Sequence, residues 1–240
     1  RQTLTLLGGL TFLSLAPRLH AASPGEVSEV LLGYSSIAFA SYSAALEAAV
    51  ELQGRIASFL SSPSDESLLA ARTAWLAARD WYGQTEAFRF YGGPIDGRGG
   101  PEGRINAWPV DASYIDYVRS KPNAGMIGDA GFDISEESLA GRNELNGEAN
   151  ICTGWHAMEF LLWGQDQDQN GPGRRPFTDY VPGGAPNADR RRRVLEVVTS
   201  LLVKDLDTVQ QAWHPQSGAY RSGFATDETA LRKIFVGLGT

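Results

Sequence analysis

The sequence predicts an all-α protein, an antiparallel helical bundle whose helices are joined by two long loops. Three observations predict this fold. Apolar residues recur at helical spacings over long stretches, helix-capping patterns precede two of these stretches, and no stretch shows the strict alternation of a half-buried strand. The 240 residues are 42% hydrophobic and 20% charged, which is the composition of a globular protein and excludes a mainly disordered one.

The first residues form a segment that differs from the rest of the chain. Residues 4–15 (LTLLGGLTFLSL) carry no charge, follow Arg1, and lead to the small residues Ala21 and Ala22. This order is typical of a signal peptide with cleavage near Ala21 or Ala22. We therefore interpret residues 1–22 as a signal peptide and expect export to the periplasm or cell envelope.

A buried N-terminal helix is the alternative for this segment, but its two glycines and Pro17 disfavour a helix. The apolar run is too short to span a membrane, and no later stretch reaches about 18 uninterrupted apolar residues. No transmembrane span is therefore expected in the mature chain. We interpret that chain, residues 23–240, as a single helical domain.

Capping patterns mark the first two helices of this domain. Ser23, Pro24 and Glu26 favour a helix start, and the helical spacing then continues to about Leu60. The following SPSD segment predicts the start of a second helix. This helix is expected to continue until the glycines and proline of residues 92–94 stop it.

Three further helices are predicted. The third crosses roughly Asn143 to Trp163, and the fourth extends from Asn187 to Trp213 with leucine and valine at spacings of three and four. A last helix begins near Thr226 and is still apolar where the sequence stops. This ending predicts a domain that is incomplete at its C-terminus.

Two long segments rich in glycine and proline, residues 92–131 and 164–186, interrupt the helical pattern. Loops of this length within compact domains are usually functional or disordered. Both segments contain aromatic residues, in which flexible linkers are poor. We therefore expect two ordered insertions that pack over one end of the bundle.

Charge and cysteine content exclude several classes of function. Lys and Arg number 21 against 28 Asp and Glu, which gives a net charge of −7. A general attraction to nucleic acid or to anionic lipid is therefore not expected. The single cysteine, Cys152, excludes an internal disulfide framework and cysteine-rich zinc or iron–sulfur sites. Any metal site must rely on histidine and carboxylates.

The predicted third helix combines apolar residues with metal-binding residue types. Helical spacing places two stripes side by side, the first with Ile151, Trp155, Met158 and Leu162, the second with Cys152, His156, Glu159 and Trp163. We expect this helix to be largely buried, with the side chains of His156 and Glu159 adjacent and one turn apart. A buried pair of this kind needs hydrogen-bond or metal partners.

Two interpretations of the pair remain open. In a structural role, Glu159 accepts a hydrogen bond from His156 and the pair fixes a helix crossing. In a metal site, both side chains are ligands of one iron, manganese or zinc ion. Two ligands are too few for such an ion, so further ligands must come from another helix or from an insertion.

The predicted second helix offers a third ligand. One stripe of this helix alternates apolar and charged residues: Leu68, Arg72, Trp75, Arg79, Tyr82, Glu86 and Phe90. Glu86 lies near the loop end, and we expect its carboxylate to approach His156 and Glu159. Arg79 or Arg89 would then balance a carboxylate. Pairing of arginine with glutamate at the bundle surface explains the same stripe equally well.

Other motifs in the sequence give weaker evidence of function. The segment DQDQNG, residues 166–171, begins like a calcium-binding loop, but the twelfth position is Phe177, so we interpret it as a polar turn. The four arginines of residues 190–193 are interpreted as a solvated helix face. The HExxH, GxSxG, P-loop and dinucleotide-binding motifs are absent from the sequence, so zincin, hydrolase and nucleotide-binding functions lack support.

Residues 154–166 (GWHAMEFLLWGQD) resemble the GxHxxE signature of the imelysin family, and specifically its iron-regulated, IrpA-like branch. The resemblance extends over most of residues 30–240, in the segments WLAARDWYGQTEAFRFYGGPID, GPEGRINAWP, GFDISEESLAGRNELNGEANI and GPGRRPFTDY. It implies an exported all-α protein of two bundle-like halves, of which the second is mostly missing from this sequence.

The resemblance also implies a site. Gly154, His156 and Glu159 match the signature residues, which lie in a pocket between the halves. Gly154 is expected to let a neighbouring backbone approach beside His156. We place Cys152, Trp163 and Arg79 in the same pocket.

Two functions are implied by the resemblance: periplasmic iron binding or uptake, and metallopeptidase activity. Peptidase chemistry requires about three protein ligands and a separate general base, so we favour binding of iron or another divalent metal by His156, Glu159 and Glu86. The expected partners are a metal ion or small ligand and a cell-envelope protein. A structural protein with a vestigial pair is the third alternative.

Overall fold

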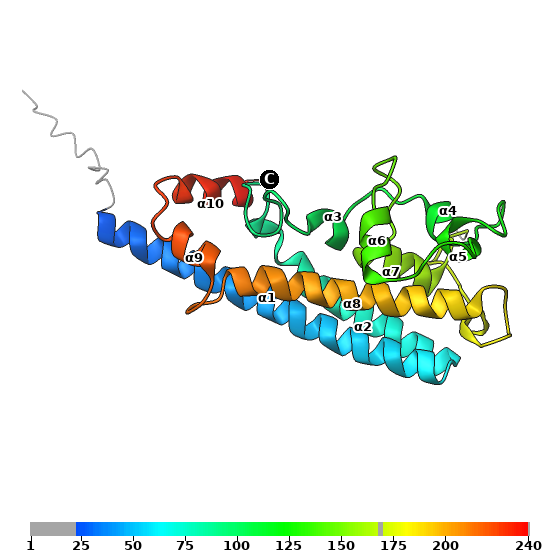
Figure 1. Cartoon of the computed structure of the whole chain (residues 1–240). Coiled ribbons are helices and arrows are strands. Elements are labelled where there is room, and N and C mark those ends of the chain that lie inside the picture. Colours follow the sequence, from blue (N-terminus) through cyan, green and yellow to red (C-terminus); the bar gives the residue numbers. More distant parts are fainter. Residues whose placement is uncertain (1–22, 168–169, 240) are drawn as a thin grey trace, which may run out of the picture.

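The computed structural model describes residues 23–167 and 170–239, and the interpreted signal peptide lies outside these residues. The described part is all-α, as predicted, and contains no β-strand, only an isolated bridge between Val118 and Lys121. Figure 1 shows its order along the chain. The elements are α1 (Pro24–Ser61), α2 (Asp65–Gly83), the 3₁₀ turn η1 (Glu86–Phe88), α3 (Glu102–Ile105), α4 (Ala112–Ile115), α5 (Gly125–Gly128), α6 (Glu136–Arg142), α7 (Gly154–Trp163), the 3₁₀ turn η2 (Phe177–Tyr180), α8 (Ala188–Ala212), α9 (Ala219–Phe224) and α10 (Ala230–Leu238).

Three long helices, α1, α2 and α8, form the bundle, and α1 packs antiparallel against the other two (Figure 1). Their predicted starts are confirmed. Ser23 and Glu26 form a capping box at the start of α1, and Ser64 and Ser67 form the equivalent box at α2. The fourth predicted helix is confirmed as α8, with Asn187 and Trp213 as its flanking residues.

The second helix is shorter than predicted. It ends at Gly83, because the next N–H groups turn back to carbonyls three residues earlier, at Trp81 and Tyr82. The hydroxyl of Thr85 also donates to the Tyr82 carbonyl, 2.7 Å away, and so satisfies a carbonyl that an α-helical N–H would have taken. The predicted stripe therefore ends at Tyr82, and Glu86 belongs to a separate 3₁₀ turn.

The third helix starts later than predicted, at Gly154 instead of near Asn143. Asn143 instead folds the preceding loop back on itself, since its side-chain oxygen accepts the N–H groups of Cys152 and Thr153 at 2.9 and 3.2 Å. The α7 helix packs on α2 and α8. The last predicted helix is present as α10, and the short helix α9 was not predicted.

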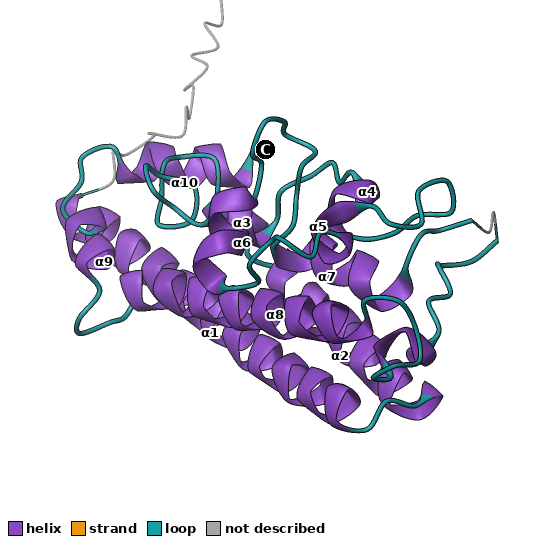
Figure 2. Cartoon of the chain, turned by 45° about the vertical axis from the view of Figure 1, so that its right-hand side comes forward, coloured by secondary structure: helices purple, strands orange, loops and turns teal. Residues whose placement is uncertain are grey.

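The two insertions are ordered in the described residues, as expected, but they cover one side of the bundle instead of one end. Short helices α3, α4 and α5 of the first insertion and the η2 turn of the second contact α7 or α8. Figure 2 shows these loops and short helices gathered over α7 and α8.

The arginine run of residues 190–193 is not a solvated face, which corrects the prediction. Arg190 donates at 2.7 to 2.9 Å to the backbone carbonyls of Met126, Ile127 and Asp129 in the first insertion and of Phe132 directly after it. Arg192 donates to the carbonyl of Tyr180 in the second insertion. Only Arg193 is a surface residue, where it pairs with Glu196. The run ties both insertions to α8.

A buried ionic cluster completes this attachment. Arg191 and Arg175 both bind the carboxylate of Asp116, at 2.6 and 2.7 Å, and each of the three side chains is at most 2% exposed. Asp179 accepts from Arg175 and from the hydroxyl of Tyr117. Both guanidinium groups also lie over the Tyr117 ring. Four residues from both insertions are thus fixed to one helix.

In the part of the chain that the structure describes, no helix combines the length and apolar character needed to cross a membrane. This finding includes α1, which is 38 residues long but carries polar and charged residues along its length.

Candidate metal centre

The site begins at Gly154, where α7 starts against the backbone of α3. Gly154 has a φ of +75°, and a Cβ atom at this position would lie 2.3 Å from the carbonyl oxygen of Ile105 and 2.5 Å from that of Arg104. Both the conformation and the close approach require glycine. The expected approach of a neighbouring backbone beside His156 is therefore observed, and α3 provides it.

The remainder of α7 is held by its buried face and by its last turn. Trp155, Met158 and Leu162 are fully buried, as the first stripe predicted. Arg72 of α2 donates from Nε and Nη2 to the carbonyl oxygen of Leu162, at 3.1 and 2.8 Å. This contact satisfies a carbonyl at the end of α7 and places a positive charge where the helix dipole favours it. The helix that carries the signature is thus fixed at both ends.

His156 and Glu159 lie side by side on the neighbouring face of α7. The distance between Nδ1 of His156 and Oε2 of Glu159 is 3.1 Å. The side chain of His156 is 18% exposed and that of Glu159 is 45% exposed. The predicted adjacency is confirmed, but the expected burial of Glu159 is not. The carboxylate faces solvent because the second stripe opens into a cleft.

This cleft has a volume of about 560 Å³ and has His156 and Glu159 in its wall. Four aromatic residues line it as well: Trp75, Trp108, Phe160 and Trp163. The Trp108 ring lies 4.9 Å from the imidazole of His156 and is 69% exposed. Sequence reasoning did not select Trp108, although it lies in the GPEGRINAWP segment. A site with an imidazole–carboxylate pair and aromatic walls can hold an organic ligand as well as an ion.

Cys152 does not reach the cleft. It precedes α7, so helical spacing from His156 does not apply to it. Its buried thiol donates to the carbonyl of Leu139, and burial raises the pKa of this thiol to about 12. The prediction that Cys152 shares a stripe with His156 is therefore wrong in the structure, whereas Trp163 does line the cleft.

Glu86 and the two candidate arginines form separate contacts. Glu86 pairs with Arg89 at 2.5 Å, and Arg89 also pairs with Glu102 of α3 at the same distance. Arg79 lies over the ring of Tyr82, 5.2 Å from its centre. None of the three lines the cleft. Glu86 left the predicted stripe because α2 ends before it.

The donor set fits a metal that brings other ligands with it. Imidazole and carboxylate are good ligands for iron and other divalent metals, and the pair is adjacent and reachable from solvent. Within residues 23–167 and 170–239, however, no three histidine, cysteine, aspartate or glutamate residues are grouped so that they could hold an ion. Asp166 lines the same cleft without completing such a group.

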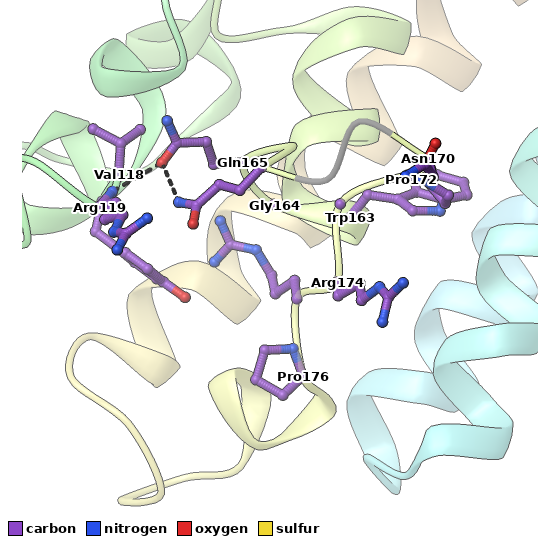
Figure 3. A pocket seen from close by; sticks show the side chains of 13 residues that line it. Val118, Arg119, Trp163, Gly164, Gln165, Asn170, Pro172, Arg174 and Pro176 are labelled. Atoms are coloured by element: carbon purple, nitrogen blue, oxygen red, sulfur yellow. Dashed lines mark hydrogen bonds between the residues drawn. The ribbon is translucent and has the colours of Figure 1, made fainter.

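A second cleft adjoins the first. It has a volume of about 800 Å³ and shares five lining residues with the first cleft: Trp163, Gly164, Gln165, Pro172 and Gly173. Figure 3 shows Gln165 beside Arg119, with its side-chain oxygen accepting the Arg119 backbone N–H at 2.9 Å. The two clefts therefore lie on either side of one ledge, formed by the end of α7 and the start of the second insertion.

Comparison with known proteins gives the same family that the GxHxxE segment of the sequence resembles. A family model described as Imelysin matches residues 38–240. The chain is 33% identical over 138 residues to Iron-regulated protein A of Synechococcus elongatus, an alignment that covers 54% of this chain and 38% of that protein.

A solved structure shares the fold. It is a protein of Parabacteroides distasonis, provisionally described as an iron-regulated protein A precursor, with a TM-score of 0.65 and 18% identity. The match covers 92% of this chain and 56% of that one. The chain therefore spans little more than a third of the curated relative and just over half of the solved one.

Proposed function

Because this chain belongs to the imelysin family, we propose that it is an exported protein that binds iron, or another divalent metal, through His156 and Glu159 in iron uptake or homeostasis. The observation that carries the proposal is the contact of 3.1 Å between His156 Nδ1 and Glu159 Oε2 inside an open cleft. The name of the curated relative, Iron-regulated protein A, supports the choice of iron.

The geometry around the pair supports a ligand role more than a purely structural one. A pair that only fixes a helix crossing is expected to lie between helices, with its polar atoms away from water. Here both side chains open into the cleft, and the helix crossing is held instead by Gly154 and by Arg72. His156 and Glu159 are therefore not needed to fix the helix crossing, which is the role that the structural alternative gives them.

Metallopeptidase activity is the alternative function, and it is less well supported. Such an enzyme uses about three protein ligands and a separate general base around one open coordination position. If His156 and Glu159 both bind the metal, the described lining residues offer only Asp166 as a further carboxylate. The proposal is therefore binding without substantial proteolysis by this chain.

Metal titration of the parent and three variants tests the proposal. Ferrous and ferric iron, zinc and calcium are added to the parent, to His156→Ala, to Glu159→Gln and to the double variant, and bound metal is measured after dialysis. Each single substitution is expected to lose most of the affinity, and the double variant little more, because both side chains bind the same ion. Equal binding by the parent and His156→Ala would refute the metal site.

Two surface residues provide matched controls. His214 is a histidine outside the cleft that contacts Ser217, and Glu196 forms an i, i+3 pair with Arg193, as Glu159 does with His156. His214→Ala and Glu196→Gln are expected to retain parental binding. Peptide cleavage that chelators abolish, and that disappears in Glu159→Gln, would favour the peptidase. Loss of thermal stability in His156→Ala, with no metal bound by the parent, would favour the structural pair.

A further inference from the structure

The cleft supplies two metal ligands but far more space than an ion needs. The six waters of a hexahydrated ion occupy about 180 Å³, at ~30 Å³ each. The cleft has about 560 Å³, which lies within the range of about 300–1,000 Å³ that is usual for sites of small organic molecules. An ion bound to His156 and Glu159 alone would leave most of this volume, and most of its own coordination positions, to other groups.

The walls of the cleft favour flat aromatic groups over water. Trp108 presents a ring that is 69% exposed and lies 4.9 Å from the His156 ring. Trp163 lies on the same cleft and is fixed by an edge contact with Trp75 at 5.3 Å and by the guanidinium of Arg72, 5.6 Å from the ring centre. An exposed ring beside the ligand pair has no packing role in the core. Such rings stack on planar groups of a ligand.

Positive charge lies just beyond the aromatic part. The adjoining cleft shares Trp163 and Gly164 with the first and is lined by Arg119 and Arg174, which come from different insertions (Figure 3). Chelators of iron bind through anionic oxygen atoms, so a chelate in the first cleft that extends over the Gly164 ledge would meet these guanidinium groups.

From the two-ligand count, the volume, the aromatic wall and the neighbouring arginines, we propose that this site takes iron already bound to an aromatic, anionic chelator of the catecholate class, instead of the bare ion. The inference rests on the proposed function, because His156 and Glu159 would bind the coordination positions that the chelator leaves open. Trp108 would stack on the chelator, and Arg119 would attract its charge.

Three iron probes of known form test the inference by calorimetry and by quenching of tryptophan fluorescence. They are the ferrous ion alone under anaerobic conditions, ferric iron complexed with citrate, and ferric iron complexed with 2,3-dihydroxybenzoate. Binding of the dihydroxybenzoate complex is expected to be at least about tenfold tighter than that of the other two, a difference that calorimetry resolves readily. Iron-free dihydroxybenzoate is expected to bind far more weakly than its iron complex.

Variants separate this inference from the proposed function. Trp108→Ala is expected to weaken the dihydroxybenzoate complex about five- to tenfold and to weaken binding of the ferrous ion by a clearly smaller factor. Arg119→Gln is expected to weaken both chelates and to reduce their salt dependence. Trp81→Ala, an exposed tryptophan on another groove, and Arg55→Gln, a surface arginine paired with Glu51, are the matched controls.

Each outcome decides one question. If the bare ferrous ion binds as tightly as the aromatic complex, or if citrate and dihydroxybenzoate complexes bind equally, the chelate inference is overturned while His156-dependent metal binding survives. Equal binding of iron-free dihydroxybenzoate would also overturn it. If no probe depends on His156, both the inference and the proposed function fail.

Discussion

Arg191 of α8 and Asp116 of the first insertion form a buried ion pair with two contacts, at 2.6 and 3.2 Å. The same carboxylate binds Arg175 of the second insertion, so one acid joins three segments that are distant in the sequence. Arg175 in turn donates its backbone N–H to the carbonyl of Trp163, which lines the candidate site. The ion pair therefore stabilises the wall of the cleft as well as the fold.

Substitution of Asp116 by Asn is expected to destabilise the protein strongly. It would leave Arg191 buried without a carboxylate partner and Arg175 with Asp179 alone, and breaking such a buried pair costs about 3–5 kcal/mol. Urea unfolding followed by circular dichroism measures the effect. The surface pair of Arg193 and Glu196 is the control, and Glu196→Gln should change the free energy of unfolding by less than about 1 kcal/mol. Similar effects of the two substitutions would contradict the buried role of Asp116.

The same carboxylate predicts a dependence of stability on pH. Burial alone would raise the pKa of Asp116, but hydrogen bonds from Arg191 and the charge of Arg175 outweigh it and hold the pKa below its usual value. A pKa lowered in the folded state gives a stabilising contribution that is complete above the unfolded pKa, near 3.9, and is lost as pH falls through the folded pKa. The stability difference between the parent and Asp116→Asn should therefore be constant above about pH 5 and shrink below pH 4. A difference that grows with acidity would reverse the assignment.

Much of the fold follows from local patterns in the sequence. The capping residues Ser23 and Ser64 locate two helix starts, and the spacing of Leu and Val residues locates α8. These signals are local, because a cap or a helical stripe depends on neighbours within one or two turns. Helical spacing within the predicted third helix also placed the side chains of His156 and Glu159 next to each other, as observed.

The errors at the arginine run and at Trp108 arise where distant side chains decide the outcome, whereas the error at Glu86 is local. Arg190 and Arg191 look like surface residues until the carbonyls of the first insertion and Asp116 are placed around them. Glu86 was assigned to the site by extending a helix that Thr85 ends. Trp108 was missed because its proximity to His156 depends on how the first insertion folds back over α7. Helical spacing describes only residues within a few turns of each other, so it cannot predict contacts between distant segments.

Export predicts a mature chain that lacks residues 1–22. Expression of the natural precursor with its secretion apparatus, followed by intact-mass measurement of the exported protein, should give an N-terminus close to Ala21 or Ala22. The motivation is the uncharged run followed by small residues. Retention of Arg1 to His20 in the exported chain would refute the signal-peptide assignment. A variant with two lysines inside the run should remain in the cytoplasm and serves as the control.

Cys152 is expected to be inert in the folded protein. Burial raises the pKa of its thiol to about 12, so only about one molecule in ten thousand carries a thiolate at pH 8. A thiol-reactive dye should therefore label the native protein only as fast as the protein opens, and label one thiol per chain at once in guanidinium chloride. Rapid labelling of the native state would contradict the burial of Cys152.

Gly154 gives the most direct link between fold and site. Gly154→Ala would force a Cβ atom to within 2.3 Å of the Ile105 carbonyl oxygen at a φ of +75°, so the start of α7 must move. We expect a loss of about 1–3 kcal/mol in the free energy of unfolding and weaker metal binding by His156, two residues away. Gly54 of α1 is the matched control, since its φ is ordinary and no atom lies within 4 Å of an added Cβ. Gly54→Ala should be neutral or stabilising by up to about 1 kcal/mol. If Gly154→Ala behaves like Gly54→Ala in both measurements, α7 does not depend on its contact with α3.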